Sequence, residues 1–404
     1  LGFFQNLILG EQSNKARTYL SVESHCHRPN HLDRIHHMKR ILFSVLVLIV
    51  CLSGLELIAR CFSFPTLDSP SVGMQLQAHP TRIWSMRPGS QEQFGAMVTV
   101  DELGMRQTKT TPNSKKWLIL GDSSFFGHGL DDNETLHHHL EETLRTDKSN
   151  IDVLCGATPG YSTLQSLDFM NEIGWDLQPS VLVIGNLWSD NNFDHFQDAE
   201  WISELHKPQH RLLRMMGQSH LFIQLTRLWR PDLLNSSVNE ASPHAKISWV
   251  RDPYSSGRRR VPLEIYINTL STIILEARDR NIAVLLIQPA NKYRMDIATV
   301  EYTWDPYFKT QRAIATHFDI PILDVATTLR AFGLNKSQSF LDDMHPTGEA
   351  NFWIAQHIAD IWKRRQENGD AWIPNQDEAP TISLKDKWST MSESLSKPNR
   401  DTLP

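Results

Sequence analysis

Residues 117–124 read WLILGDSS, and this stretch decides the fold class. It begins as an uninterrupted apolar run, 117–121, which is typical of a strand buried on both faces, as in a parallel sheet. The Gly-Asp-Ser-Ser sequence that ends it predicts a turn from this strand into a helix. Such a turn leaves the hydroxyl of Ser123 exposed at the carboxyl end of the strand.

Outward from this stretch, apolar strands alternate with helices. The sequence predicts strands over 151–156, 181–186, 282–289 and 321–325, and helices over 133–144 (with Asn133 as N-cap), 162–173, 261–280, 304–318 and 348–365. A short strand and turn over 94–108 precede them. This alternation predicts an α/β fold with a central, mostly parallel five-stranded sheet and helices on both faces. Ligands of such folds bind at the carboxyl ends of the strands.

Bulk composition limits the class of protein. The chain has 404 residues, of which 40% are hydrophobic and 21% charged, so most of it can form a folded core. The formal net charge of −6 argues against nucleic acid as a partner. The four cysteines, Cys26, Cys51, Cys61 and Cys155, have no metal-ligand spacing, which excludes a disulfide scaffold and a zinc ribbon.

One segment departs from the soluble pattern. Residues 41–55 read ILFSVLVLIVCLSGL without a charge, and Glu56 alone interrupts the apolar residues that follow. A basic flank, 38–40, precedes the run, and no small-x-small cleavage site follows it. We therefore predict a signal anchor or transmembrane helix over 38–60, with a cleaved signal peptide and a buried core helix as the alternatives. Basic residues are more numerous before the run than after it, which places the C-terminal bulk outside the cytoplasm, in the periplasm or at the cell surface.

The remaining organisation follows from composition. Residues 1–37 are predicted to be a flexible or untranslated extension with Met38 as the natural start, and their histidine-rich tract leaves a metal site as the alternative. Residues 61–112 are predicted to be a linker followed by the short strand region. Residues 113–365 form the main domain, and 366–404 a disordered polar tail.

The main domain is interrupted by a helical insertion at 191–258. Within it, residues 210–231 have apolar side chains at helical spacing beside several arginines. We expect this helix to pack on the domain, with a lid over the site and a lipid-facing helix as alternatives.

Chemically distinctive residues follow successive strands. Ser123 follows the first strand, Gly160 lies in the turn after the second, and Asn186 ends the third. Asp342 and His345 come just before the last helix. Because the carboxyl ends of parallel strands meet at one edge of a sheet, we expect these residues to converge.

Each of these residues matches a task in ester cleavage. A serine hydroxyl needs a neighbouring base, which His345 supplies, and Asp342 can orient the imidazole. The developing oxyanion needs donors, for which the N–H groups of Ser123 and Gly160 and the amide of Asn186 are the candidates. Each feature alone has an ordinary explanation, such as a helix cap or a turn glycine; their order along the chain favours catalysis.

The blocks resemble those of the SGNH hydrolases, also called GDSL esterases and lipases. Gly-Asp-Ser at 121–123, Gly160 within PGYST, Gly185-Asn186, and Asp342 three residues before His345 are similar to the family's blocks, and the likeness spans 94–365. It implies a three-layer α/β/α sandwich of flavodoxin-like type, no metal or organic cofactor, and hydrolysis through an acyl-Ser123 intermediate. The chain departs from the family at Leu187, where many members have aspartate.

These patterns together predict a membrane-anchored serine esterase. The expected partners are an ester or O-acylated cell-envelope glycan as substrate, with lipid esters second, and the membrane through the N-terminal helix. An acyltransferase with the same triad, and a non-catalytic glycan-binding envelope protein, are the alternatives. Outside the motif, we expect His128 to be a loop residue, Asp190 and Asn191 to line the pocket, and Arg258, Arg259 and Arg260 to form a solvated turn.

Overall fold

The computed structural model describes residues 31–62, 76–79, 81–107, 111–146, 150–194, 196–207, 219–229, 258–296, 302–369 and 372. These fall into two compact units. The smaller unit contains 31–62 and 219–229, and the larger unit contains the rest. Residues 1–30 of the predicted extension, much of the predicted insertion and most of the predicted tail lie outside the described residues.

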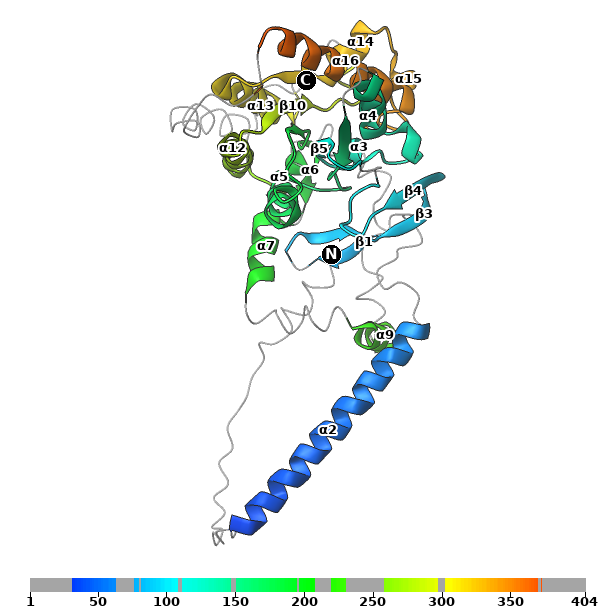
Figure 1. The fold of residues 1–404 in the computed structure, drawn as a ribbon, viewed down its shortest axis with the longest axis vertical. Helices are drawn as coiled ribbons and strands as arrows, with labels where there is room; N and C mark the ends of the chain where they lie inside the picture. Colours follow the sequence, from blue (N-terminus) through cyan, green and yellow to red (C-terminus); the bar gives the residue numbers. More distant parts are fainter. Residues whose placement is uncertain are drawn as a thin grey trace, which may run out of the picture. The chain divides into compact units, whose positions relative to one another are not determined.

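A parallel sheet of five strands forms the centre of the larger unit (Figure 1). The strands are β5 (Lys115–Leu120), β6 (Ile151–Cys155), β7 (Val181–Ile184), β10 (Ala283–Gln288) and β11 (Ile322–Asp324), in the spatial order β11-β10-β7-β5-β6. Every neighbouring pair is parallel, which confirms the predicted α/β fold. The strand order reverses between β5 and β7, and ligands of α/β sheets bind at such a switch point.

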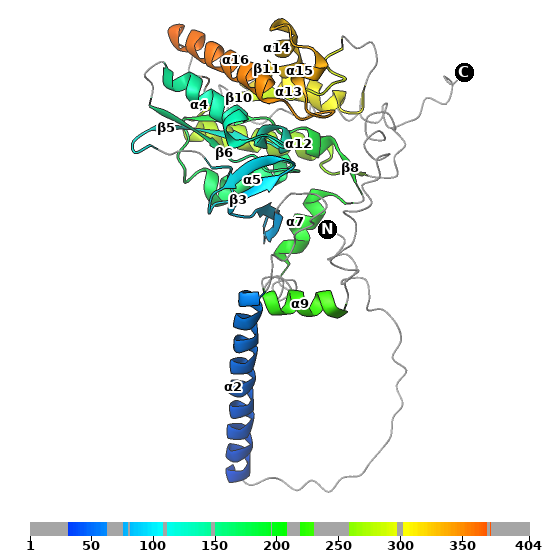
Figure 2. The same ribbon diagram turned by 90° about the vertical axis from the view of Figure 1, so that its right-hand side faces the viewer.

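Helices cover both faces of this sheet (Figure 2). One face packs against α4 (Leu136–Thr146), α14 (Val325–Ala331) and α16 (Gly348–Glu367), and the other against α5 (Thr163–Phe169), α12 (Leu263–Asp279) and α13 (Asp305–Phe318). Each face of the sheet has its own hydrophobic core, and side chains alternate between the two along β5. Trp117 and Ile119 pack on the face covered by α4, α14 and α16, and Leu118 and Leu120 pack on the opposite face.

Shorter elements connect these layers. They are α3 (Ser123–Phe126), the 3₁₀ turn η1 (Asp132–Glu134), the π-helical η2 (Met170–Gly174), α6 (Trp188–Asn191), β8 (Phe193–Asp194), α7 (Asp198–His206), β9 (Arg258–Arg259) and α15 (Lys336–Ser339). The predicted N-cap Asn133 lies inside η1, because reciprocal hydrogen bonds between Asp131 and Glu134 form a separate turn before α4.

Two hairpins precede β5 in the segment predicted to be mainly linker. They are β1 (Leu76–His79) with β2 (Ile83–Met86), and β3 (Gly89–Gln93) with β4 (Ala96–Val100). Met86 and Val98 are fully buried, so these strands belong to the core. Arg106 forms bridges to both Val100 and Cys155, which joins the second hairpin to β6 at the edge of the central sheet.

Trp372, in the predicted tail, is part of the same core. Its side chain is fully buried, and its ring lies 4.8 Å from that of Trp362 and 6.3 Å from that of Trp117, centroid to centroid. Its carbonyl accepts a hydrogen bond from the N–H of Val284 at the sheet. The core therefore extends past the predicted end of the domain.

The smaller unit contains α2 (His31–Phe62) and α9 (His220–Trp229). Within α2, the segment Met38–Cys61 is long and apolar enough to cross a membrane, which makes it a candidate span. Glu56 accepts hydrogen bonds from the Ser219 hydroxyl at 2.7 Å and from the N–H of Leu221 at 3.0 Å. The one acidic residue of the apolar run thus caps the start of α9.

Candidate active site

The turn after β5 places Ser123 at the start of α3. Asp122 caps this helix, because its carboxylate accepts a hydrogen bond from the N–H of Ser124 at 3.0 Å. The Phe125 ring lies so close to Gly121 and Gly185 that a Cβ on either would meet it at 2.7 Å and 2.2 Å, respectively. Glycine at both positions therefore lets α3 pack directly against the ends of β5 and β7.

The structure brings together Ser123, His345 and Asp342, although Ser123 and His345 are 222 positions apart in sequence. His345 Nε2 lies 2.8 Å from Ser123 Oγ, and its Nδ1 lies 2.6 Å from Asp342 Oδ2. The other carboxylate oxygen of Asp342 accepts the N–H groups of Met344 and His345 at 2.8 Å and 2.9 Å. This arrangement fixes both the imidazole and the carboxylate that orients it.

The charge state of Asp342 follows from these contacts. Burial by itself would raise the pKa of this carboxyl group. The hydrogen bond and charge of His345, together with the two backbone N–H groups, outweigh burial and hold the pKa well below its ordinary value. Asp342 is therefore ionised at neutral pH, as the partner of an imidazolium must be.

Gly160 and Asn186 lie on the loops that follow β6 and β7, the strands on either side of β5. Gly160 adopts a positive φ of 78°, and its carbonyl accepts a hydrogen bond from Arg260 at 2.8 Å. Asn186 is fully buried, and its side-chain nitrogen donates to the Tyr161 carbonyl at 3.4 Å. Their role as oxyanion donors, with the N–H of Ser123, stays a prediction.

Leu187 is fully buried in the core, so it gives Asn186 no polar support. Support comes from elsewhere: the Asn186 carbonyl accepts hydrogen bonds from the hydroxyl of Tyr266 at 3.1 Å and the amide of Gln311 at 3.4 Å. Contacts between distant segments thus hold the backbone at the position where the sequence departs from the family pattern.

Two buried carboxyl groups lie near the motif residues. Burial raises the pKa of Asp122, the residue before Ser123, to about 6, against the opposing hydrogen bond from Ser124 and the charge of His345. Burial also raises the pKa of Asp190 to about 7. Asp190 accepts hydrogen bonds from the Thr163 N–H at 2.9 Å and hydroxyl at 2.5 Å, so it joins α6 to the start of α5. Its side chain is fully buried, and its place in the lining of the pocket stays a prediction.

The three arginines that were predicted to form a solvated turn lie in three different environments. Arg258 pairs with Glu200 at the surface, and Arg259 lies over the ring of Tyr307. Arg260 is buried and makes two hydrogen bonds to Asp198, at 2.9 Å and 2.7 Å, while it holds the Gly160 carbonyl. The expectation of solvent exposure is wrong for Arg260, because a buried carboxylate compensates its charge.

Two further residues near His345, His128 and Phe94, belong to none of the sequence motifs. The ring of His128 lies against that of His345, and Phe94 in turn lies against His128. The sequence alone could not identify either residue, since both contacts arise between segments far apart in the chain. Among the described residues, no group of three or more His, Cys, Asp or Glu side chains is placed to hold a metal ion.

Comparison with known proteins gives matches of low identity and low TM-score. No protein-family model matches the sequence, and no curated protein matches it. Solved structures that resemble it include the psychrotrophic esterase EstA from Pseudoalteromonas sp. (12% identity, 63% of this chain and 100% of that one, TM-score 0.39). Others are a lipase/acylhydrolase from Enterococcus faecalis (13%, 62% and 96%, 0.40) and a GDSL-like lipase from Bacteroides thetaiotaomicron (13%, 64% and 92%, 0.35). Such values are too low to transfer a function, which must come from the geometry of this chain.

Proposed function

We propose that the chain is a serine ester hydrolase of the SGNH type that acts through an acyl-Ser123 intermediate. The observation that supports this most directly is the hydrogen-bonded path from Ser123 Oγ through His345 to Asp342. The path lies at the carboxyl end of β5, beside the point where the strand order reverses. A serine hydroxyl, a base and an orienting carboxylate in contact define an activated nucleophile.

In the first half of the proposed reaction, Ser123 Oγ attacks the ester carbonyl carbon while its proton passes to His345 Nε2. The ionised Asp342 stabilises the imidazolium, and the oxyanion is stabilised by the N–H groups of Ser123 and Gly160 and the amide of Asn186. The bond between the carbonyl carbon and the alcohol oxygen then breaks, and that oxygen takes the proton from Nε2. Water repeats the sequence on the acyl-enzyme and releases the acid.

The proposed substrate is an O-acylated glycan of the cell envelope. The candidate span Met38–Cys61 and its basic flank support a membrane-anchored enzyme whose catalytic domain is extracytoplasmic, where such glycans are found. If a sugar hydroxyl replaced water in the second half, the same residues would transfer the acyl group. Product analysis with an acceptor glycan present separates hydrolysis from transfer.

The test compares Ser123→Ala with Ser124→Ala in the full chain in detergent. We expect Ser123→Ala to abolish hydrolysis of p-nitrophenyl acetate and labelling by a fluorophosphonate, because the nucleophile is gone. Ser124→Ala should retain most of both, since the backbone N–H of residue 124, which Asp122 binds, remains in the variant. Unchanged hydrolysis by Ser123→Ala would reject the assignment, and mapping of the label to another residue would do the same.

A further inference from the structure

Three aromatic rings in tilted contact form a row that ends on the imidazole of His345. The His128 ring lies 4.3 Å from the His345 ring, centroid to centroid, with 32° between their planes. The Phe94 ring lies 4.3 Å from the His128 ring at 48°. Phe94 comes from the turn of the β3–β4 hairpin, and 47% of its surface is exposed. An open aromatic surface therefore lies two rings from Nε2.

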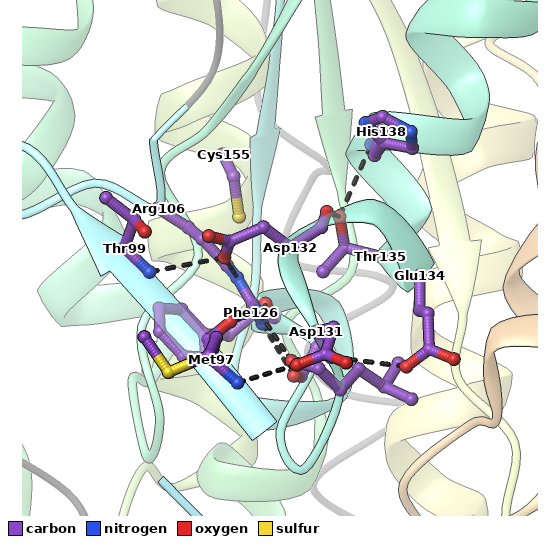
Figure 3. A network of polar contacts seen from close by, with 12 residues as sticks. Met97, Thr99, Arg106, Phe126, Asp131, Asp132, Glu134, Thr135, His138 and Cys155 are labelled. Carbon is purple, nitrogen blue, oxygen red and sulfur yellow. Dashed lines mark hydrogen bonds and ion pairs between the residues drawn. The ribbon is translucent and has the colours of Figure 1, made fainter. Parts of the chain in front are cut away.

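The hairpin is fixed to the loop that carries His128 (Figure 3). Arg106 is fully buried and donates hydrogen bonds to three carbonyls of this loop, those of Phe126, Gly127 and Leu130, at 3.0, 2.7 and 2.5 Å. Asp131 accepts the N–H of Met97, and Asp132 that of Thr99, both in β4. These contacts hold β4 and the loop together, so the fold sets the place of Phe94 beside His128.

Phe94 occupies a backbone position that does not suit it. Gln93 pairs with Ala96, so the turn consists of Phe94 and Gly95, with φ angles of 54° and 82°. Two-residue hairpin turns with both φ angles positive favour Asn-Gly, and a bulky residue in this region is an outlier that reduces stability. Stability does not explain phenylalanine at this position, and strain of this kind is concentrated at functional sites.

The chemistry of the triad assigns this surface to one side of the substrate. The departing alcohol oxygen must take its proton from His345 Nε2, so the alcohol portion leaves on the imidazole side. The oxyanion donors hold only the carbonyl oxygen, and the acyl chain is a separate substituent of the same carbon. Because Phe94 and His128 extend the row from the imidazole, they lie on the side of the alcohol.

We propose that Phe94 is a specificity residue that stacks against the sugar ring of the alcohol portion, an inference that rests on the proposed function. The face of an aromatic ring is electronegative, and the C–H groups on the face of a pyranose are weakly positive and apolar, so the two surfaces are complementary. The neighbouring His128 extends the surface toward the scissile ester. The enzyme would then recognise its substrate by the sugar more than by the acyl chain.

The test uses Phe94→Asn, which suits the turn better than phenylalanine. Two acetate esters, an acetylated methyl pyranoside and ethyl acetate, differ only in the alcohol. We expect kcat/KM for the pyranoside ester to fall about 3- to 10-fold, the size of an aromatic contact. The value for ethyl acetate should stay unchanged, and the urea midpoint should rise. Met97→Thr, an exposed position on the same hairpin, is the control and should change neither ester.

Other outcomes would overturn the inference. An equal loss on both esters would mean that Phe94 acts on His345 and not on the alcohol. A loss that grows from acetate to octanoate esters of one alcohol would place the ring on the acyl side, and a lower urea midpoint would mean a structural role. If the wild type cleaves both esters in any of these cases, the proposed function stands without the inference. If it cleaves neither and Ser123 resists fluorophosphonate, the proposed function fails.

Discussion

Replacement of Asp342 by asparagine changes one carboxylate oxygen to an NH2 group and removes one charge beside the imidazole of His345. The Oδ1 atom accepts two backbone N–H groups, and an amide oxygen can keep both contacts. The amide nitrogen then faces His345 Nδ1, which at 2.6 Å from Oδ2 must become the acceptor. Nε2 is protonated as a result, and the ring can no longer take the proton of Ser123.

The size of the loss in kcat depends on how well water can replace the Asp342 carboxylate as the acceptor beside His345 Nδ1. Loss of a deeply buried aspartate from such a triad reduces kcat about 10⁴-fold, or by about 5 kcal/mol. Here 46% of the Asp342 side chain is exposed, so water can approach Nδ1 and restore part of the correct tautomer. We therefore expect Asp342→Asn to reduce kcat about 10²- to 10³-fold, with a smaller change in KM.

The assay is hydrolysis of p-nitrophenyl acetate by the full chain in detergent, with Asp343→Asn as the matched control. Asp343 is the next residue, has a similar exposure of 43%, and pairs with Lys292 at 3.9 Å instead of contacting the imidazole. The control should keep its activity. The proposed role of Asp342 would be refuted if both variants lost activity equally, or if Asp342→Asn retained more than about a tenth of kcat.

Two further predictions concern stability. Burial raises the pKa of Asp190 from 3.8 to about 7, so the stability that its proton provides is complete below pH 3.8 and is lost as pH rises through about 7. Asp190→Asn should therefore gain up to about 4 kcal/mol over the wild type between pH 4 and pH 8 in urea unfolding, and a pH-independent difference would contradict this. Trp372→Ala should lower the free energy of unfolding by about 3–5 kcal/mol, because the side chain is fully buried. A loss below about 1 kcal/mol would show that residue 372 is outside the cooperative core.

The central sheet was predictable because each of its strands is a short apolar run with a helix before the next. The run at 117–121 corresponds to β5 (Lys115–Leu120), and the run at 282–289 to β10 (Ala283–Gln288). Strands buried on both faces need apolar side chains at every position, and few other structures produce that pattern. The motif residues could be located for the same reason, since the ends of such strands meet at one edge.

The short hairpin strands, the buried arginines and the aromatic contact beside His345 could not be predicted, because they depend on contacts that leave no local pattern in the sequence. The strands β1 (Leu76–His79) and β2 (Ile83–Met86) are short and partly polar, so their sequence resembles a linker. The sequence predicts a solvated turn for Arg260, yet a buried carboxylate compensates its charge. Arg106 has no local signal in the sequence, and carbonyls distant in the chain accept its hydrogen bonds. The contact of Phe94 with His128 joins a hairpin to a loop, and no periodicity indicates such a pair.

The chain passes between the two units three times, at residues 71–72, 207–208 and 240–241. After the second passage it returns to the candidate span, where Glu56 binds the beginning of α9. If α2 spans the bilayer, the hydrogen bonds from Glu56 hold the first turn of α9 against the last turns of the membrane-crossing helix, and they satisfy one oxygen of a carboxylate that lies in an apolar run.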